Sequence, residues 1–177
     1  MPGPVYDMET AFNFRLSELS GNYRGALLAW SHKHFEQVYG EFTCKAVKTP
    51  DADGQKKSFL AMYREAATLL KHAQSAGDPY QLVASYEPIK LGLMTLLLRR
   101  RFGTSAVVEI NGVYDSPYVY IDMPRSLKTR IKRALFVGIE KFVLRRADGI
   151  KLLFPDQIAS FGPLPRKPVI ASFADLT

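Results

Sequence analysis

Helical and strand-like segments alternate along this chain from about residue 55 to its end. Apolar residues spaced three or four apart predict helices over 59–73 and 124–147, the first of them amphipathic. A third helix, over 89–98, is apolar nearly all round and is expected to be buried. Short apolar runs bounded by turn residues predict strands over 81–86, 105–110, 149–154 and 168–173, with a short helix or turn around 156–161. This alternation is typical of α/β layering, and right-handed crossovers would make the strands parallel.

Residues at the predicted helix ends agree with this pattern. Gly77, Asp78 and Pro79 end the first helix, Pro88 begins the second, and Gly103 is its expected stop. We therefore predict an α/β, Rossmann-like, open and mostly parallel sheet with helices on both faces. A length of 177 residues fits a single domain spanning 1–177.

The first 50 residues are less regular. They suggest a helix over 9–19 and strands over 23–30 and 41–48. A Rossmann-type half normally opens with an apolar strand and a glycine-bearing turn, whereas MPGPVYD offers the turn without a strand before it.

Charge and targeting signals narrow the function classes. Twenty-four Lys and Arg against 17 Asp and Glu give a net charge of +7, which attracts nucleic acid, acidic membranes or phosphorylated substrates. The lone Cys44 excludes an internal disulfide and is expected to be a small buried residue. No apolar run is long enough for a membrane span, and the N-terminus does not resemble a signal peptide, so a cytoplasmic location is expected.

The usual catalytic motifs are missing from the sequence. It contains no GxGxxG turn, no Walker phosphate loop and no GxSxG nucleophile elbow. His32 and His34 form an H-x-H pair, but His72 is the only other histidine, so the pair is better explained as a polar turn than as a metal site. We expect no metal.

Basic residues concentrate in the helix predicted over 124–147. Residues 124–146 hold eight of the 24 basic groups and one acid, Glu140. They could form a cationic face for anionic lipid or phosphate, or an ordinary solvated helix face. Along the same helix, apolar residues recur every four positions, at Leu127, Ile131, Leu135, Ile139 and Val143.

Three further arginines lie in the last turn of the preceding helix, where cations favour the helix dipole. The candidates for membrane or phosphate contact are Arg99, Arg100, Arg101, Arg125, Lys128, Arg130, Lys132 and Arg133. Nucleic acid is the weaker expectation, because aromatic residues are not interleaved with the basic run.

Polar residues follow the predicted strands at their carboxyl ends, where ligands bind in open parallel sheets. The loop NGVYDSPYVY (111–120) is polar and aromatic, and Gly112 would let backbone approach a ligand closely. It is either part of a ligand cleft or a surface loop with aromatic packing of its own. The candidate cleft residues at these ends are Tyr86, Glu87, Asn111, Gly112, Tyr114, Asp115 and Tyr118.

From Asp78 onward the chain resembles the N-terminal domain of the family 4 retaining glycosyltransferases, which have the two-domain GT-B fold. The matching segments, in order, are DPYQLVASYEPIKLGLMTLLLRRRFG, SAVVEINGVYDS, EKFVLRRADGIKLLF and KPVIASFADL. The likeness covers about residues 78–177, and residues 9–50 only loosely.

The resemblance implies transfer of a sugar from a nucleotide-sugar donor to a glycan or lipid-linked acceptor, with retention and without a metal cofactor. In such enzymes a C-terminal domain binds the donor and the N-terminal domain shapes the acceptor side. The residues to which it assigns roles are Glu109, Asn111 and Gly112 in the cleft, Asp148 as a cap of a helix-to-strand turn, and Asp175 at the hinge. The catalytic residues stay unassigned. The donor-binding half has no counterpart in these 177 residues, so the chain alone is expected to be inactive.

Two other functions compete with this one. A non-catalytic Rossmann-like module could recruit a partner or an anionic membrane surface, and an exposed apolar patch would favour it. A basic nucleic-acid-binding protein is the third possibility, and a steep salt dependence of binding would favour that. The net charge also fits peripheral attachment to the inner face of a membrane.

Overall fold

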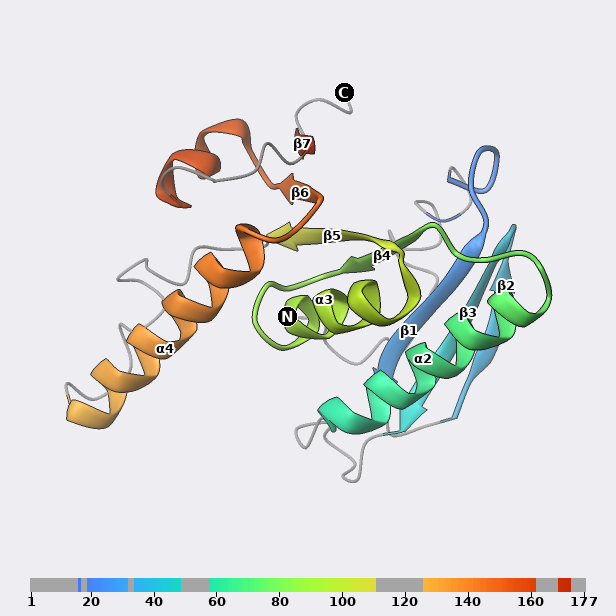
Figure 1. Ribbon diagram of the computed structural model, residues 1–177, viewed down its shortest axis with the longest axis horizontal. Coiled ribbons are helices and arrows are strands. Elements are labelled where there is room, and N and C mark those ends of the chain that lie inside the picture. The colour runs from blue at the N-terminus through green and yellow to red at the C-terminus, as the bar shows by residue number, and fades with distance from the viewer. Residues whose placement is uncertain are drawn as a thin grey trace. The chain divides into compact units, whose positions relative to one another are not determined.

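A computed structural model describes residues 16, 19–31, 34–48, 58–110, 126–161 and 169–172 of the chain (Figure 1). The chain divides into two compact units, residues 1–79 and 80–177, and each is described separately below.

The first unit contains a three-stranded sheet with the strand order β1-β3-β2. Its strands are β1 (Gly25–Ser31), β2 (Glu36–Tyr39) and β3 (Phe42–Lys48). β1 runs parallel to β3, whereas β2 and β3 form an antiparallel hairpin. The turn needs Gly40, because its φ of 55° is left-handed and an added Cβ would lie 2.2 Å from the Ser20 hydroxyl. The strands predicted over 23–30 and 41–48 are confirmed, but β2 was not predicted.

Helix α2 (Phe59–Ser75) follows this sheet. The Ser58 side chain caps it by accepting a hydrogen bond from the Ala61 amide (3.2 Å). An ion pair between Lys45 of β3 and Glu65 links the helix to the sheet, and the hydrogen bond with Glu65 raises the pKa of Lys45. Cys44 is fully buried against Leu16, and this burial raises the pKa of its thiol, so the predicted role of a small core residue is confirmed.

The second unit contains a four-stranded parallel sheet with the strand order β4-β5-β6-β7 (Figure 1). Its elements, in chain order, are β4 (Leu82–Ser85), α3 (Lys90–Phe102), β5 (Ser105–Ile110), α4 (Leu127–Leu144), β6 (Gly149–Leu152), the 3₁₀ helix η2 (Pro155–Phe161) and β7 (Val169–Ser172). Gly103 ends α3 in the left-handed conformation, with its amide donating to the Arg99 carbonyl (2.9 Å), as predicted. The predicted α/β class and the parallel strand arrangement are confirmed.

One face of the second sheet forms the core of its unit. Side chains of α3, α4 and η2 pack against the same side of β5 and β6; the cluster consists of Val108, Ile110, Val143, Leu144, Ala147, Ile150, Leu152 and Phe161, with Leu93, Leu96, Ile139 and Ile158 packed against it. We predicted helices on both faces, but the described helices of this unit cover one. The reason is the strand order, because successive right-handed crossovers that advance in one direction place their helices on the same side.

Helices α3 and α4 approach closely at Gly92. A Cβ atom on Gly92 would lie 2.8 Å from Cγ1 of Val143 and 3.3 Å from the Glu87 carbonyl oxygen. Val143 is fully buried, so glycine leaves the space that this contact needs.

Candidate functional site

The carboxyl ends of β4, β5 and β6 meet at one edge of the second sheet. Ser85 at the end of β4 is level with Val108, and Ile110 at the end of β5 is level with Leu152 at the end of β6. This is the edge where open parallel sheets bind their ligands.

Two charged residues, Glu109 and Lys151, lie next to each other near this edge. They are register partners on β5 and β6, and the Glu109 Oε2 atom is 3.4 Å from the Lys151 ammonium nitrogen. Their side chains are 12% and 23% exposed, on the face opposite the helices. A carboxylate and an ammonium that are mostly buried can together bind a ligand, because the carboxylate accepts hydrogen bonds from hydroxyls and the ammonium donates to hydroxyl and phosphate oxygens.

Sequence reasoning placed Glu109 in the cleft but missed Lys151. A signal for Lys151 was present, because it is the one charged residue inside the apolar run GIKLLF. Its pairing with Glu109 depends on the strand register, which the sequence does not state.

Glu87 is bonded to the beginning of α3. Its Oε2 accepts a hydrogen bond from the Ile89 amide (2.7 Å) and its Oε1 accepts one from the Leu91 amide (2.5 Å). The carboxylate therefore occupies the positive end of the helix dipole, the position where a helix otherwise binds a ligand anion. Tyr86, the residue before it, is half-buried, and one further step of the strand register would place it level with Glu109.

Replacing Glu87 by alanine is expected to lower the free energy of unfolding by about 1 kcal/mol, the usual loss for a helix cap. Hydrogen exchange of the first turn of α3 should rise in parallel. Glu41→Ala, at an exposed turn position, is the matched control and should leave both quantities unchanged. Unchanged protection of α3 in the Glu87 variant would show that the carboxylate does not cap the helix.

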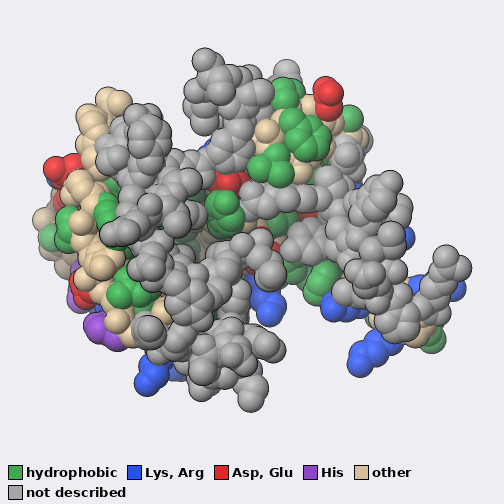
Figure 2. All heavy atoms as spheres, turned by 180° about the vertical axis from the view of Figure 1, so that it is seen from behind, with side chains coloured by type: hydrophobic (Ala, Val, Ile, Leu, Met, Phe, Trp, Pro, Cys, Tyr) green, Lys and Arg blue, Asp and Glu red, His purple; other side chains and the backbone are tan. Residues whose placement is uncertain are grey.

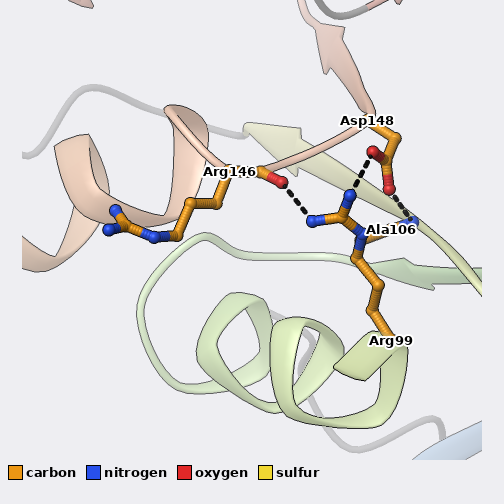
Figure 3. A network of polar contacts seen from close by, with 4 residues as sticks. All are labelled: Arg99, Ala106, Arg146 and Asp148. Carbon is orange, nitrogen blue, oxygen red and sulfur yellow. Dashed lines mark hydrogen bonds and ion pairs between the residues drawn. The ribbon is translucent and has the colours of Figure 1, made fainter. Parts of the chain in front are cut away.

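Arg99 and Asp148 belong to a network at the opposite, amino-terminal edge of the second sheet (Figure 3). The Arg99 guanidinium donates to Asp148 Oδ1 (2.8 Å) and to the Arg146 carbonyl (3.0 Å), while Asp148 Oδ2 accepts from the Ala106 amide (3.0 Å). Asp148 was expected to cap the turn between helix and strand, but its carboxylate bonds instead to Arg99 of α3 and Ala106 of β5, and Arg99 makes the contact with the turn. Arg99 is therefore bound within the fold, whereas Arg100 and Arg101 are exposed.

Four of the other candidates for membrane or phosphate contact lie on α4. Lys128, Arg130 and Lys132 are exposed and Arg133 is half-buried. The predicted residues that lie outside the described part of the chain are Asn111, Gly112, Tyr114, Asp115, Tyr118, Arg125 and Asp175. Their roles stay predictions, as does the H-x-H turn, because His32 also lies outside it.

Neither a metal site nor a membrane span is found among the residues that the structure describes. Among these, no three or more His, Cys, Asp and Glu side chains gather closely enough to hold a metal ion. Within the same ranges, no helix has both the length and the apolar character needed to cross a bilayer.

The described geometry defines an α/β unit with charged residues near the carboxyl edge of a parallel sheet. No model of a known protein family matches the chain, and no curated protein sequence matches it.

Proposed function

We propose that this chain is the acceptor-side, Rossmann-like N-terminal domain of a retaining glycosyltransferase with GT-B architecture. The observation that carries the proposal is the ion pair between Glu109 and Lys151, in register near the carboxyl edge of a parallel sheet. The resemblance to family 4 glycosyltransferases supports it, because the segments that carry it coincide with the strands and helices of the second unit.

In this proposal the two charged residues position an acceptor. The Glu109 carboxylate accepts hydrogen bonds from acceptor hydroxyls, and the Lys151 ammonium donates to hydroxyl or phosphate oxygens. Tyr86 offers an aromatic ring to the sugar. A second domain binds the nucleotide-sugar, and closure of the two domains excludes water and aligns the acceptor with the donor.

The proposal predicts that transfer requires a longer polypeptide than this chain. The 177-residue chain alone should release no nucleoside diphosphate from any of a panel of nucleotide-sugars. The native polypeptide can be captured with an antibody raised against residues 58–110. It should have about twice this mass and should release nucleoside diphosphate from at least one nucleotide-sugar of the panel.

The size and the activity of the native polypeptide test different parts of the proposal. The glycosyltransferase assignment would be contradicted if the native polypeptide had this chain's own mass and released no nucleoside diphosphate, even together with any proteins captured with it. Release by the isolated chain would contradict the proposed division of roles between two domains.

A non-catalytic binding module is the second candidate function. The observation that favours it is the exposure of large apolar side chains on α4, where Leu127 is 72% exposed. Under this alternative the charged pair near the sheet edge is structural, and Glu109→Gln would affect stability without affecting any ligand.

A further inference from the structure

The buried residues of helix α4 all lie near its carboxyl end. Its buried residues are Glu140, Val143 and Leu144, and none of its residues over 127–138 is buried. Three large apolar residues of this first part are instead among the most exposed large hydrophobic residues that the structure describes, with Leu127 at 72%, Ile131 at 60% and Leu135 at 57%. In the sequence the same four-residue spacing continues from these three residues to Ile139 and Val143, and the structure divides this stripe between solvent and core.

The spacing of the stripe explains this division. An α-helix turns through about 100° per residue, so residues four apart are rotated by about 40°. Over the four steps from Leu127 to Val143 the rotation amounts to about 160°, which takes the stripe from one side of the helix to the other. The apolar start of the stripe therefore faces away from the core that its end enters.

The exposed apolar residues form one continuous strip, which we call the outer face of α4. It spans about 100° of the helix circumference and consists of Leu127, Ile131, Ala134, Leu135, Gly138 and Phe142, all of them exposed. A helix of a water-soluble unit normally directs such a strip at its own core.

Basic residues border the outer face on both sides. Lys128 lies along one border, with Lys132 further round the helix and its ammonium 5.5 Å from the centre of the Phe136 ring. Arg130 and Lys141 lie along the other border. The sequence has no acid from 127 to 139, and Glu140 is buried. In Figure 2, several Lys and Arg side chains project at the lower right, where this helix lies.

We propose that the outer face of α4 docks on an anionic lipid bilayer, with the helix lying in the plane of the interface. An apolar strip between two basic borders matches the acyl chains below and the anionic headgroups beside such a helix. A second copy of this chain is a poorer occupant, because it would bring like charges together along both borders. The inference stands on α4 alone and does not depend on glycosyl transfer.

Sedimentation of the full chain with vesicles tests the proposal. Binding to phosphatidylcholine vesicles containing phosphatidylglycerol is expected, with much weaker binding to phosphatidylcholine alone and weakening by added salt. Replacing Lys128, Arg130 and Lys132 together by glutamine should reduce the partition coefficient roughly 100-fold. Replacing Leu127, Ile131 and Leu135 together by serine should reduce it by at least roughly tenfold.

Each triple variant has a matched control of the same chemistry. Arg64, Lys71 and Lys90 are exposed on α2 and α3, and their replacement by glutamine removes the same charge. Leu60, Leu82 and Leu97 are about as exposed as Leu135, and their replacement by serine removes similar apolar surface. Both controls should bind vesicles nearly as the parent chain does, and circular dichroism should show every variant folded.

Three outcomes would overturn the proposal. The first is no binding, or binding that is independent of the anionic lipid. The second is a loss of binding in the control variants as large as in the α4 variants. The third is a dimer, seen by sedimentation equilibrium, that is lost in the apolar α4 variant although this variant still binds vesicles as the parent chain does. That result would show that the outer face makes a protein contact.

Discussion

Replacing Asp148 by alanine is expected to destabilise the protein by about 2 kcal/mol, the range for hydrogen bonds to charged groups. The carboxylate accepts from the amide of Ala106, a fully buried strand residue, and from the guanidinium of Arg99. Its removal leaves a buried amide without that acceptor and the Arg99 cation without its counter-ion. Thermal unfolding followed by circular dichroism should show a midpoint lower by several degrees.

A second aspartate–arginine pair provides the control for this prediction. The guanidinium of Arg24 lies 2.6 Å from Oδ1 of Asp78, but both side chains are mostly exposed. Asp78→Ala should therefore change the free energy of unfolding by less than about 0.5 kcal/mol. If the two variants were equally stable, the bond from Asp148 to β5 would contribute no more than a surface ion pair.

Replacing Gly92 by alanine is expected to cost about 2 kcal/mol, although alanine is the better helix former. The new methyl group would lie 2.8 Å from Val143, which is fully buried, and 3.3 Å from a backbone carbonyl oxygen. Neither neighbour can move without disturbing the contact between α3 and α4. Urea unfolding measures the loss, and hydrogen exchange in residues 90–102 should rise with it.

Gly138→Ala is the matched control, because Gly138 also lies within a helix. A Cβ atom at this position would have no neighbour within 4 Å. The substitution should therefore stabilise the protein by about 0.5–1 kcal/mol, the difference in helix propensity. Opposite signs for the two glycines are the expected result, and equal signs would show that Val143 does not set the spacing of the helices.

Local signals predicted most of the secondary structure. Gly103 and the turn at Gly77–Pro79 marked helix ends correctly, and β-branched residues marked β5. Strand β2 was missed because it has four residues, three of them exposed, and lacks the apolar alternation that identifies a strand. It is held by the hairpin with β3, which is a tertiary feature.

The candidate site was harder to predict because its pairings join distant parts of the chain. The sequence predicts an anion contact for Arg99, whereas its partner in the structure is Asp148, 49 residues further along. Lys151 was overlooked for the same reason, since only the register of β5 and β6 brings it to Glu109. The exposed side of α4 is predictable from its four-residue spacing, because each step of four residues rotates the side chain by about 40° around the helix.

The strand order of the second unit has a consequence for how the chain folds during its synthesis. Each strand from β5 to β7 pairs with the strand made just before it, so none must wait for a partner that is still to be synthesised. A growing chain can therefore add one strand and its helix at a time as residues emerge. The hydrogen bond from the Ala106 amide to the Asp148 carboxylate then links β6, as it forms, to β5, which is already folded.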